Sequence, residues 1–426
     1  MKTLIELLRA NKEADGFRVC DKKTETYELF FVHRALETVR ATDTGETSVT
    51  VYVNHDGKVG DSTFTVYGSM TEEDIKTKID AAVERARLVF NEPYDLPKGG
   101  TEARELPSNL KEADPRTLAA RIADAVFAAD CRENASLNAT EIFLYRDTRH
   151  VVNSCGIDKT QISYRAMIET IPTYTDSKDS VELYEAIRLT DFDPQKVTEE
   201  ITAKMEEVSL RHRAVKPATP LRSDVVLRAK EISQLMWTLA DDLTYRQVYA
   251  QSNLHHTGDA LQGSSADPHD SIELTATGAV RGSDRAAFFD QDGVSLTDTT
   301  LIRDGHVNAY FGSHRFASYL GRPETGELPC IRLSTGTLKS EELSRSPYIE
   351  CVSLSGLQVD LYNDYIGGEI RLAYRHDGDH VEPLTGITMS AKLSEVLATL
   401  RLSDTETVRG SYAGPDKMLL HGVTLM

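Results

Sequence analysis

Hydrophobic residues at helical spacing mark one stretch in the second half of the chain. Residues 225–227 form a short apolar run that is typical of a buried strand. The next apolar residues recur three or four positions apart, which gives a helix a single buried stripe. They are Ile232, Leu235, Met236 and Leu239. The pattern therefore predicts a strand that continues directly into an amphipathic helix ending near Asp242.

The first half of the chain alternates between strand-like and helix-like patterns. Residues 48–53 and 63–67 alternate in polarity, and Asp56-Gly57 between them is typical of a hairpin turn. Thr71 and Asp74 stand in capping-box positions, so a helix is predicted to follow. A second helix is predicted after Asp114-Pro115, since proline favours the first helical position. Further strands are predicted at 141–145, 151–154, 161–171 and 181–189, with another helix over 194–211.

After residue 242 the pattern is mostly strands and turns. Hairpin signals recur at 292–293, 304–305, 367–368 and 377–378, and a late helix is predicted at 393–400. We therefore expect an α+β fold, with N-terminal helix and β-meander units followed by a β-rich, barrel-like antiparallel C-terminal domain. Proline-rich connections at 91–107 and 213–220 suggest three domains. Their expected bounds are 1–107, 108–220 and 221–426.

Composition narrows the class of protein. The chain has 48 Lys and Arg against 67 Asp and Glu, a net charge of -19, so strong nucleic-acid binding is not expected. No apolar run approaches the roughly 20 residues that span a bilayer, and no secretion signal is evident. The five cysteines form no CxxC pair. A reducing cytoplasm is therefore the expected location, with no membrane partner.

Motifs in the second half resemble those of the TldD/PmbA (TldD/TldE) family, whose members have been described as modulators of DNA gyrase. The first is Phe288–Val294 (FFDQDGV), followed by Thr299–Gly305 (TTLIRDG). The second is Gly367–Ile370 (GGEI), followed by Pro383–Ser390 (PLTGITMS). The third is the C-terminal segment from Ala413 to Leu425. The resemblance is strongest over residues 225–426, and the order of the earlier units also fits the family.

The resemblance implies that this chain lies in the non-zinc, TldE/PmbA-like branch. The zinc branch carries HExxxH on the helix described above, where this chain has Trp237, Thr238 and Asp242. It also carries a cysteine near the C-terminus, and residues 410–425 contain none. Indole and hydroxyl groups are not the ligands and base that zinc hydrolysis uses. The family then implies a non-catalytic chain without a cofactor of its own, with zinc in the partner only.

Two partners are consistent with the resemblance. A TldD-like zinc protease subunit would form a dimer with this chain and cleave an unfolded peptide in a shared chamber. Alternatively, the chain is a homodimeric peptide-binding scaffold. A third hypothesis is an active metallopeptidase whose ligands include His255, His256 or His269. In each case Trp237, Thr238, Asp241 and Asp242 are expected to line a groove, although Trp237 could equally belong to the core.

Other candidate residues have simpler interpretations. Cys330 is expected to be a buried, inert thiol. His376 and His380 flank an Asp-Gly pair, so we expect them at the exposed sides of a hairpin turn rather than on a metal. Asp241 and Asp242 could form a carboxylate pair for acid–base chemistry, but a solvated helix end is the alternative. Ser334–Thr337 lies in no nucleophile-elbow motif.

Overall fold

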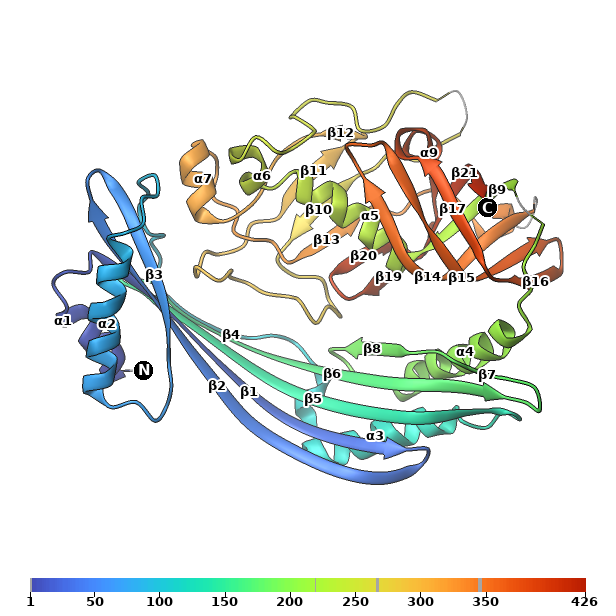
Figure 1. Cartoon of the computed structure of the whole chain (residues 1–426), viewed down its shortest axis with the longest axis horizontal. Coiled ribbons are helices and arrows are strands. Elements are labelled where there is room, and N and C mark those ends of the chain that lie inside the picture. The colour runs from blue at the N-terminus through green and yellow to red at the C-terminus, as the bar shows by residue number, and fades with distance from the viewer. Residues whose placement is uncertain (1, 219, 266–267, 344–346) are drawn as a thin grey trace.

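A curved sheet and a separate β-rich half make up the protein, seen here in a computed structural model (Figure 1). The structure describes residues 2–218, 220–265, 268–343 and 347–426. The first half contains, in order, α1 (Lys2–Ala10), β1 (Gly16–Val32), β2 (Ala35–His55), β3 (Lys58–Val66), α2 (Glu72–Ala86), β4 (Thr101–Glu105), the 3-10 helix Asn109–Glu112, α3 (Pro115–Ala128), β5 (Ala135–Asn153), β6 (Asp158–Thr175), β7 (Ser180–Glu182), β8 (Glu185–Leu189) and α4 (Pro194–Arg213).

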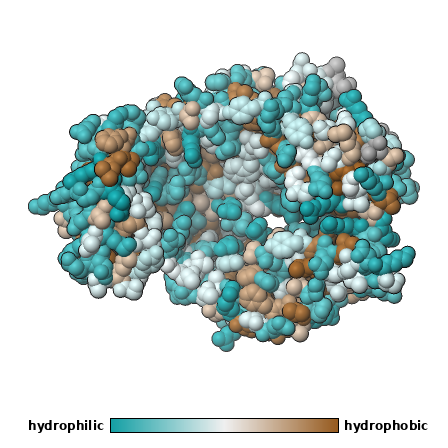
Figure 2. Space-filling view, viewed as in Figure 1, coloured by the Kyte–Doolittle hydropathy of each residue, from teal (hydrophilic) through white to brown (hydrophobic). Residues whose placement is uncertain are grey.

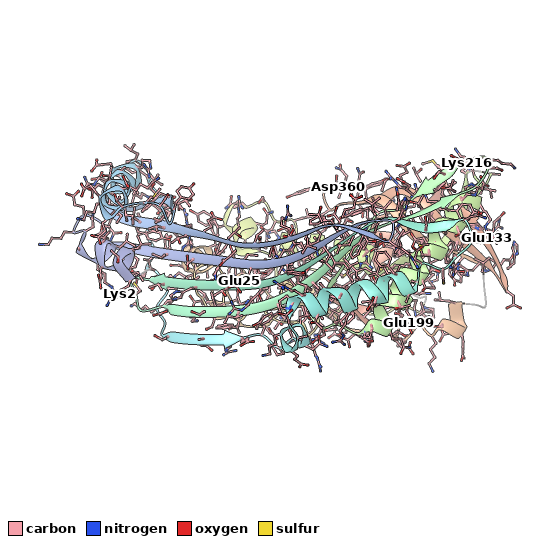
Figure 3. The ribbon with its side chains drawn as sticks, turned by 90° about the horizontal axis from the view of Figure 1, so that it is seen from below. Lys2, Glu25, Glu133, Glu199, Lys216 and Asp360 are labelled. Atoms are coloured by element: carbon pink, nitrogen blue, oxygen red, sulfur yellow. The ribbon has the colours of Figure 1, made fainter. Side chains whose placement is uncertain are left out.

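The strands of this half form one sheet in the order β3-β2-β1-β5-β6-β4, with β7 and β8 paired to β6. Its strands are long and antiparallel apart from β4, which pairs with β6 in parallel. Helices cover one face of the sheet at its two ends. Helices α1 and α2 pack at one end and α3 and α4 at the other. Figure 3 shows Glu25 in the uncovered middle between them.

Two local predictions are confirmed in this half. Thr71 and Asp74 form the reciprocal capping box at the start of α2. Asp56 and Gly57 have φ values of 51° and 71° in the turn between β2 and β3, a conformation in which glycine avoids a steric cost. The long connection at 91–107 differs from a plain linker because residues 101–105 form β4. Most of its side chains are exposed, so the strand has no apolar alternation that could reveal it.

The remaining elements build the second half. They are β9 (Leu221–Arg228), α5 (Ala229–Asp242), α6 (Tyr245–Tyr249), β10 (Leu274–Thr277), β11 (Thr299–Arg303), β12 (His306–Val307), α7 (His314–Leu320), β13 (Cys330–Leu333), α8 (Ser340–Leu343), β14 (Tyr348–Asp360), β15 (Tyr365–Asp377), β16 (His380–Leu384), β17 (Ile387–Lys392), α9 (Leu393–Thr399), β18 (Arg401–Leu402), β19 (Glu406–Arg409), β20 (Tyr412–Pro415) and β21 (Lys417–Leu425).

A closed barrel is the centre of this half. Strands β14, β9, β21, β17 and β15 pair in that order, and β15 pairs back with β14 to close the ring. The ring is antiparallel except where β9 and β14 run in parallel. A second sheet, in the order β12-β11-β10-β13-β20-β19, lies beside it, and α5 contacts both. The expected α+β fold with a barrel-like C-terminal half is therefore confirmed.

The sheet topology bears on the expected domains. The boundary at 107 and 108 falls between strands of the same sheet, since β1 pairs with β5 along most of its length. Residues 1–107 and 108–220 therefore share one sheet and do not have a sheet each. The boundary at 220 and 221 precedes β9, and we propose it as the start of the C-terminal domain. No helix among the described residues is long and apolar enough to cross a membrane.

Candidate functional site

Helix α5 is the element on which the candidate residues lie. It begins directly after β9, and its predicted stripe is buried in the main core of the second half. Arg228, at the junction of strand and helix, donates from Nε to the buried Glu350 carboxylate at 2.9 Å. This ion pair and the buried stripe fix how the helix is rotated. Its remaining face carries Trp237 and Thr238, which are partly buried, and Asp241, which is exposed.

Trp237 is half-buried and packs against the edge of the core. Its indole Nε1 donates a hydrogen bond to Ser411 Oγ at 2.9 Å. Ser411 lies between β19 and β20, in the C-terminal segment of the chain. The structure thus brings the C-terminal segment against α5, and a tryptophan and a serine occupy the contact. Sequence reasoning missed Ser411 because 174 residues separate the two side chains.

Neither Thr238 nor Asp241 is arranged for acid–base chemistry. Thr238 Oγ1 donates to the backbone carbonyl of Gln234 at 3.0 Å, so the hydroxyl is bonded within its own helix. Asp241 is exposed, whereas Asp242 is only 7% exposed. Their carboxylates therefore occupy different environments. The alternative of a paired acid–base site at these two residues does not fit this arrangement, because adjacent helical positions point in different directions.

Asp242 instead holds the loop that follows α6. Its carboxylate accepts hydrogen bonds from the backbone N–H of Leu254 at 2.7 Å and of His255 at 3.1 Å. His255 Nδ1 lies 3.0 Å from the same carboxylate. Burial by itself raises the pKa of the Asp242 carboxyl, but the hydrogen bonds from His255 and Leu254 outweigh it, so the pKa is below its ordinary value. The carboxylate is charged and fully engaged at neutral pH.

The three histidines of the metallopeptidase hypothesis have separate surroundings. His255 contacts Asp242, whereas His256 is exposed and its backbone N–H donates to Asp259 at 2.7 Å. His269 is also exposed and precedes the buried Asp270. Within residues 2–218, 220–265, 268–343 and 347–426, no group of three or more His, Cys, Asp and Glu side chains has a metal-binding arrangement. The donor set around α5 therefore does not fit a catalytic zinc.

Two other candidates also have structural surroundings. Cys330 is fully buried beside Ser283, and burial raises the pKa of its thiol, as expected for an inert core cysteine. The Asp-Gly pair does form the turn between β15 and β16. The expectation that His376 is exposed there was wrong. Its ring stacks on Tyr348 and its Nε2 lies 3.1 Å from the buried Glu350 carboxylate.

A buried acid on α5 was also missed. Glu231 is 3% exposed, and burial raises the pKa of its carboxyl above the ordinary value. Near it is Cys351, which is fully buried. A charged residue in the first turn of an amphipathic helix is normally assigned to the solvent face. Only the position of β14 over this turn reveals that Glu231 faces inward.

The edge beside Trp237 is tied to the curved sheet through charges. Arg409, at the end of β19, donates to Glu185 at 2.8 Å. Glu185 also lies 3.0 Å from Lys204, which pairs with Glu207 at 2.8 Å. Glu185 and Lys204 belong to β8 and α4 of the first half. The β19–β20 corner therefore lies between α5 and the sheet, and Figure 2 shows this side of the molecule as hollowed and largely hydrophilic.

The first family-like motif, Phe288–Val294, forms another of the contacts between the two halves. Asp290 is buried and its Oδ1 accepts from the backbone N–H of Asp292 at 2.9 Å and of Val294 at 3.0 Å. The loop held in this way places Phe289 against the sheet. There Arg149 stacks over the Phe289 ring, 4.3 Å from its centroid, and donates to the Phe289 carbonyl. This motif therefore positions the two halves.

The comparisons agree with this architecture. Residues 221–426 match the PmbA/TldA metallopeptidase C-terminal domain. No curated protein sequence matches the chain. The fold is similar over 99% of both chains to TldE from Thermococcus kodakarensis, with a TM-score of 0.81 at 16% identity.

Two further solved structures are similar, and both are described as proposed modulators of DNA gyrase. The protein from Thermotoga maritima has a TM-score of 0.79 at 14% identity, over 100% of this chain and 99% of that one. The protein from Bacteroides thetaiotaomicron has a TM-score of 0.79 at 14% identity, over 100% and 97%. The C-terminal half of the chain, residues 221–426, therefore matches the PmbA/TldA metallopeptidase family, and the chain as a whole shares the fold of these three structures.

Proposed function

We propose that this protein is a TldE/PmbA-like subunit of a TldD/TldE-type zinc protease complex that acts on unfolded peptides. In this role it contributes a wall of the peptide chamber and no zinc. The observation that carries the proposal is the contact between Trp237 and Ser411. The contact joins the helix and the C-terminal segment, the two segments to which the resemblance assigns the zinc motif and the cysteine of the zinc branch, and this supports the proposal.

The residues along α5 support a binding role. Trp237 offers an aromatic surface whose polar N–H is already satisfied, and Thr238 and Asp241 lie on the same helix face. Large aromatic side chains supply much of the contact energy in recognition surfaces. A groove lined in this way can hold a peptide in place without activating water. In this proposal the complex is cytoplasmic, in keeping with the composition.

Reconstitution tests the proposal. The chain is purified alone and mixed with a TldD-like chain encoded in the same genome, and hydrolysis of an unfolded peptide is followed by mass spectrometry. We expect no cleavage by this chain alone and strong cleavage by the mixture. Full activity of the partner alone, or chelator-sensitive cleavage by this chain alone, contradicts the proposed role.

A matched pair of variants distinguishes two roles of Trp237, contact with the bound peptide and packing in the core. Trp237→Ala removes the aromatic surface, whereas Trp237→Phe keeps an aromatic ring and removes the hydrogen bond to Ser411. If Trp237 contacts the peptide, the alanine variant raises the KM of the reconstituted complex more than the phenylalanine variant does. Equal effects of both variants on KM would assign Trp237 to the core instead.

A further inference from the structure

Two carboxylates oppose each other on the curved sheet. Glu141 of β5 lies directly opposite Glu169 of β6 in the antiparallel register, and both side chains are partly exposed. Side chains at directly opposed positions have Cβ atoms about 5 Å apart, and like charges at such positions destabilise a sheet. The pair therefore works against the fold, and a bound positive charge would relieve the repulsion.

The register places this pair on the face of the sheet that is turned toward the second half. Arg149 is an even number of positions from Glu141 along β5, and Gln161 is an even number from Glu169 along β6, so all four share one face. Arg149 and Gln161 both bond to the Phe288–Val294 motif of the second half. Helices α3 and α4 cover the opposite face. The pair therefore faces the hollow between the two halves that is visible in Figure 2.

Arginines on the same face are paired with other carboxylates. These pairs are Arg40 with Glu28, Arg165 with Asp147 and Arg188 with Asp284. Glu169 accepts a hydrogen bond from the neutral hydroxyl of Tyr184 at 2.7 Å. Glu141 has neither a hydrogen bond nor an ion pair within the part of the chain that the structure describes. The two carboxylates thus carry charge that the neighbouring arginines do not balance.

The surroundings of Glu141 disfavour its charge. Burial raises the pKa of this carboxyl, the neighbouring Glu169 raises it further, and the more distant Arg40 only partly offsets these effects. A cation placed between the two carboxylates would reverse this balance, because an opposite charge favours the ionised form. The position is therefore suited to a positively charged ligand.

Aromatic rings lie directly beside the carboxylates. Phe30 of β1 is opposite Glu141 on its other side. The Phe30 ring packs edge-to-face on Phe143, with 5.7 Å between centroids, and Phe143 stacks on Tyr145 at 6.1 Å. All three rings are partly exposed. Such rings pack well against the methylene groups of a long basic side chain, and they attract its charged end.

A metal ion fits this position less well. Phenyl rings supply no metal ligands, and two carboxylates are fewer than a protein site for a divalent cation normally offers. Among the residues that the structure describes, no group of three or more His, Cys, Asp and Glu side chains has a metal-binding arrangement. The combination of two carboxylates and exposed rings favours an organic cation.

We infer that Glu141 and Glu169 bind a lysine or arginine side chain of the peptide that the proposed complex cleaves. The inference rests on the proposed function for the source of the ligand, an unfolded peptide. The charged end of the side chain lies between the two carboxylates, and its methylene groups lie over Phe30 and Phe143. The site is also close to the β19–β20 corner. Glu169 is opposite Ala186, and the preceding residue, Glu185, binds Arg409 at that corner.

Peptide binding to this chain alone tests the site. Fluorescence anisotropy compares a labelled, unstructured peptide that contains lysine with the same peptide in which norleucine replaces lysine, since norleucine keeps the methylene groups and lacks the charge. We expect the lysine peptide to bind about tenfold more tightly, as a charge-assisted contact provides. This preference should disappear in the double variant Glu141→Gln, Glu169→Gln.

A control carboxylate is available on the other face of the sheet. Glu25 of β1 lies opposite Arg146, an odd number of positions from Glu141 in the paired strand. Glu25→Gln removes the same charge from the chain and should leave the preference for lysine unchanged. Equal binding of the two peptides to the unmodified chain would overturn the inference. An equal loss of preference in Glu25→Gln and in the double variant would do the same, since it would reflect only the net charge.

Thermal stability provides a second measurement on the same variants. Because Glu141 and Glu169 repel each other, Glu141→Gln should leave the melting temperature unchanged or raise it. Circular dichroism checks that the variant is folded. A clearly lower melting temperature would mean that the Glu141 carboxylate supports the fold, which contradicts its assignment to a ligand.

Cleavage by the reconstituted complex separates this inference from the proposed function. We expect a higher KM for the norleucine peptide than for the lysine peptide, and a higher KM for the lysine peptide when the complex contains the double variant. Cleavage with the same KM in all cases overturns the inference and leaves the proposed function standing. Absence of any cleavage, together with binding of the lysine peptide through Glu141 and Glu169, overturns the proposed function and supports the cation site.

Discussion

Trp237 and Ser411 meet across the surface of α5, with 2.9 Å between the indole Nε1 and the serine Oγ. One residue lies on the helix and the other between β19 and β20. The hydrogen bond satisfies the only polar atom of a half-buried tryptophan, which is how such rings are usually accommodated. It also connects the helix to an edge that is itself tied to the curved sheet by Arg409 and Glu185.

The strength of this contact can be measured directly. Ser411→Ala and Trp237→Phe each remove one partner, and the double variant completes a mutant cycle. We expect each single variant to lower the free energy of unfolding, with a coupling of about 1 kcal/mol, the usual net value of a neutral hydrogen bond. Urea unfolding followed by circular dichroism provides the measurement. A coupling near zero would mean that the two side chains contribute independently.

Local elements of the fold follow from the sequence because their causes are local. The stripe of α5 and the cap at Thr71 each depend on residues within two turns of one another. The pairing of β4 with β6 and the contact of Ser411 with Trp237 do not. They depend on chain segments more than fifty residues apart, and neither segment has a periodicity that predicts its partner.

Asp242 should stabilise the loop at Leu254 and His255 through its charge. Its pKa is lower in the folded protein than in the unfolded chain. This stabilisation is therefore complete above the ordinary carboxyl pKa of 3.8 and is lost as the pH falls through the folded value. Asp242→Asn should cost about 1.5–3 kcal/mol at neutral pH, typical of hydrogen bonds to a charged group. The difference from the unmodified chain should shrink in acid.

Thermal unfolding of both proteins between pH 3 and pH 7 checks this expectation. The exposed neighbour provides the control, because Asp241→Asn should have little effect at any pH. A loss of stability that is the same at every pH would assign the effect to packing and not to charge.

Glu231 should show the opposite dependence on pH. Its folded pKa is above the ordinary value of 4.5, because burial disfavours the charged form. Stability is therefore greatest below 4.5 and declines as the pH rises through the folded pKa. Glu231→Gln should remove this decline. The melting temperature of the variant should therefore exceed that of the unmodified chain by more at pH 8 than at pH 4. Melting curves at both values test it, and an unchanged pH profile of the variant would contradict the assignment.

Zinc content tests the proposed role as a subunit without its own zinc. We expect less than about 0.1 zinc per purified chain, because Trp237 and Thr238 are not zinc ligands and the Asp242 carboxylate is already engaged. Inductively coupled plasma mass spectrometry gives the number. About one zinc per chain that is lost in His255→Ala, and retained in the exposed control His380→Ala, would support the metallopeptidase hypothesis instead.

The candidate site was less predictable than the fold because side-chain surroundings decide what each residue can do. The sequence places Trp237, Thr238 and Asp242 on one helix, but it cannot show that Asp242 serves a loop or that Thr238 bonds its own helix. His376 is a similar case. The turn beside it was predictable from Asp-Gly, whereas its stacking on Tyr348 depends on the register in which β14 pairs with β15.

Asp290 should control how firmly the two halves are joined. Its Oδ1 accepts from the backbone N–H groups of Asp292 and Val294, and its Oδ2 accepts from the backbone N–H of Glu327 at 3.1 Å. Asp290→Asn replaces one acceptor with a donor and should cost about 1–3 kcal/mol, the price of one unsatisfied buried group. Asp290→Ala removes all three bonds and should cost more.

Hydrogen exchange in these variants should speed up at Val294 and along the facing sheet strands, since Phe289 and Arg149 meet there. Exchange that changes only within the loop would mean that the halves are held together by other contacts.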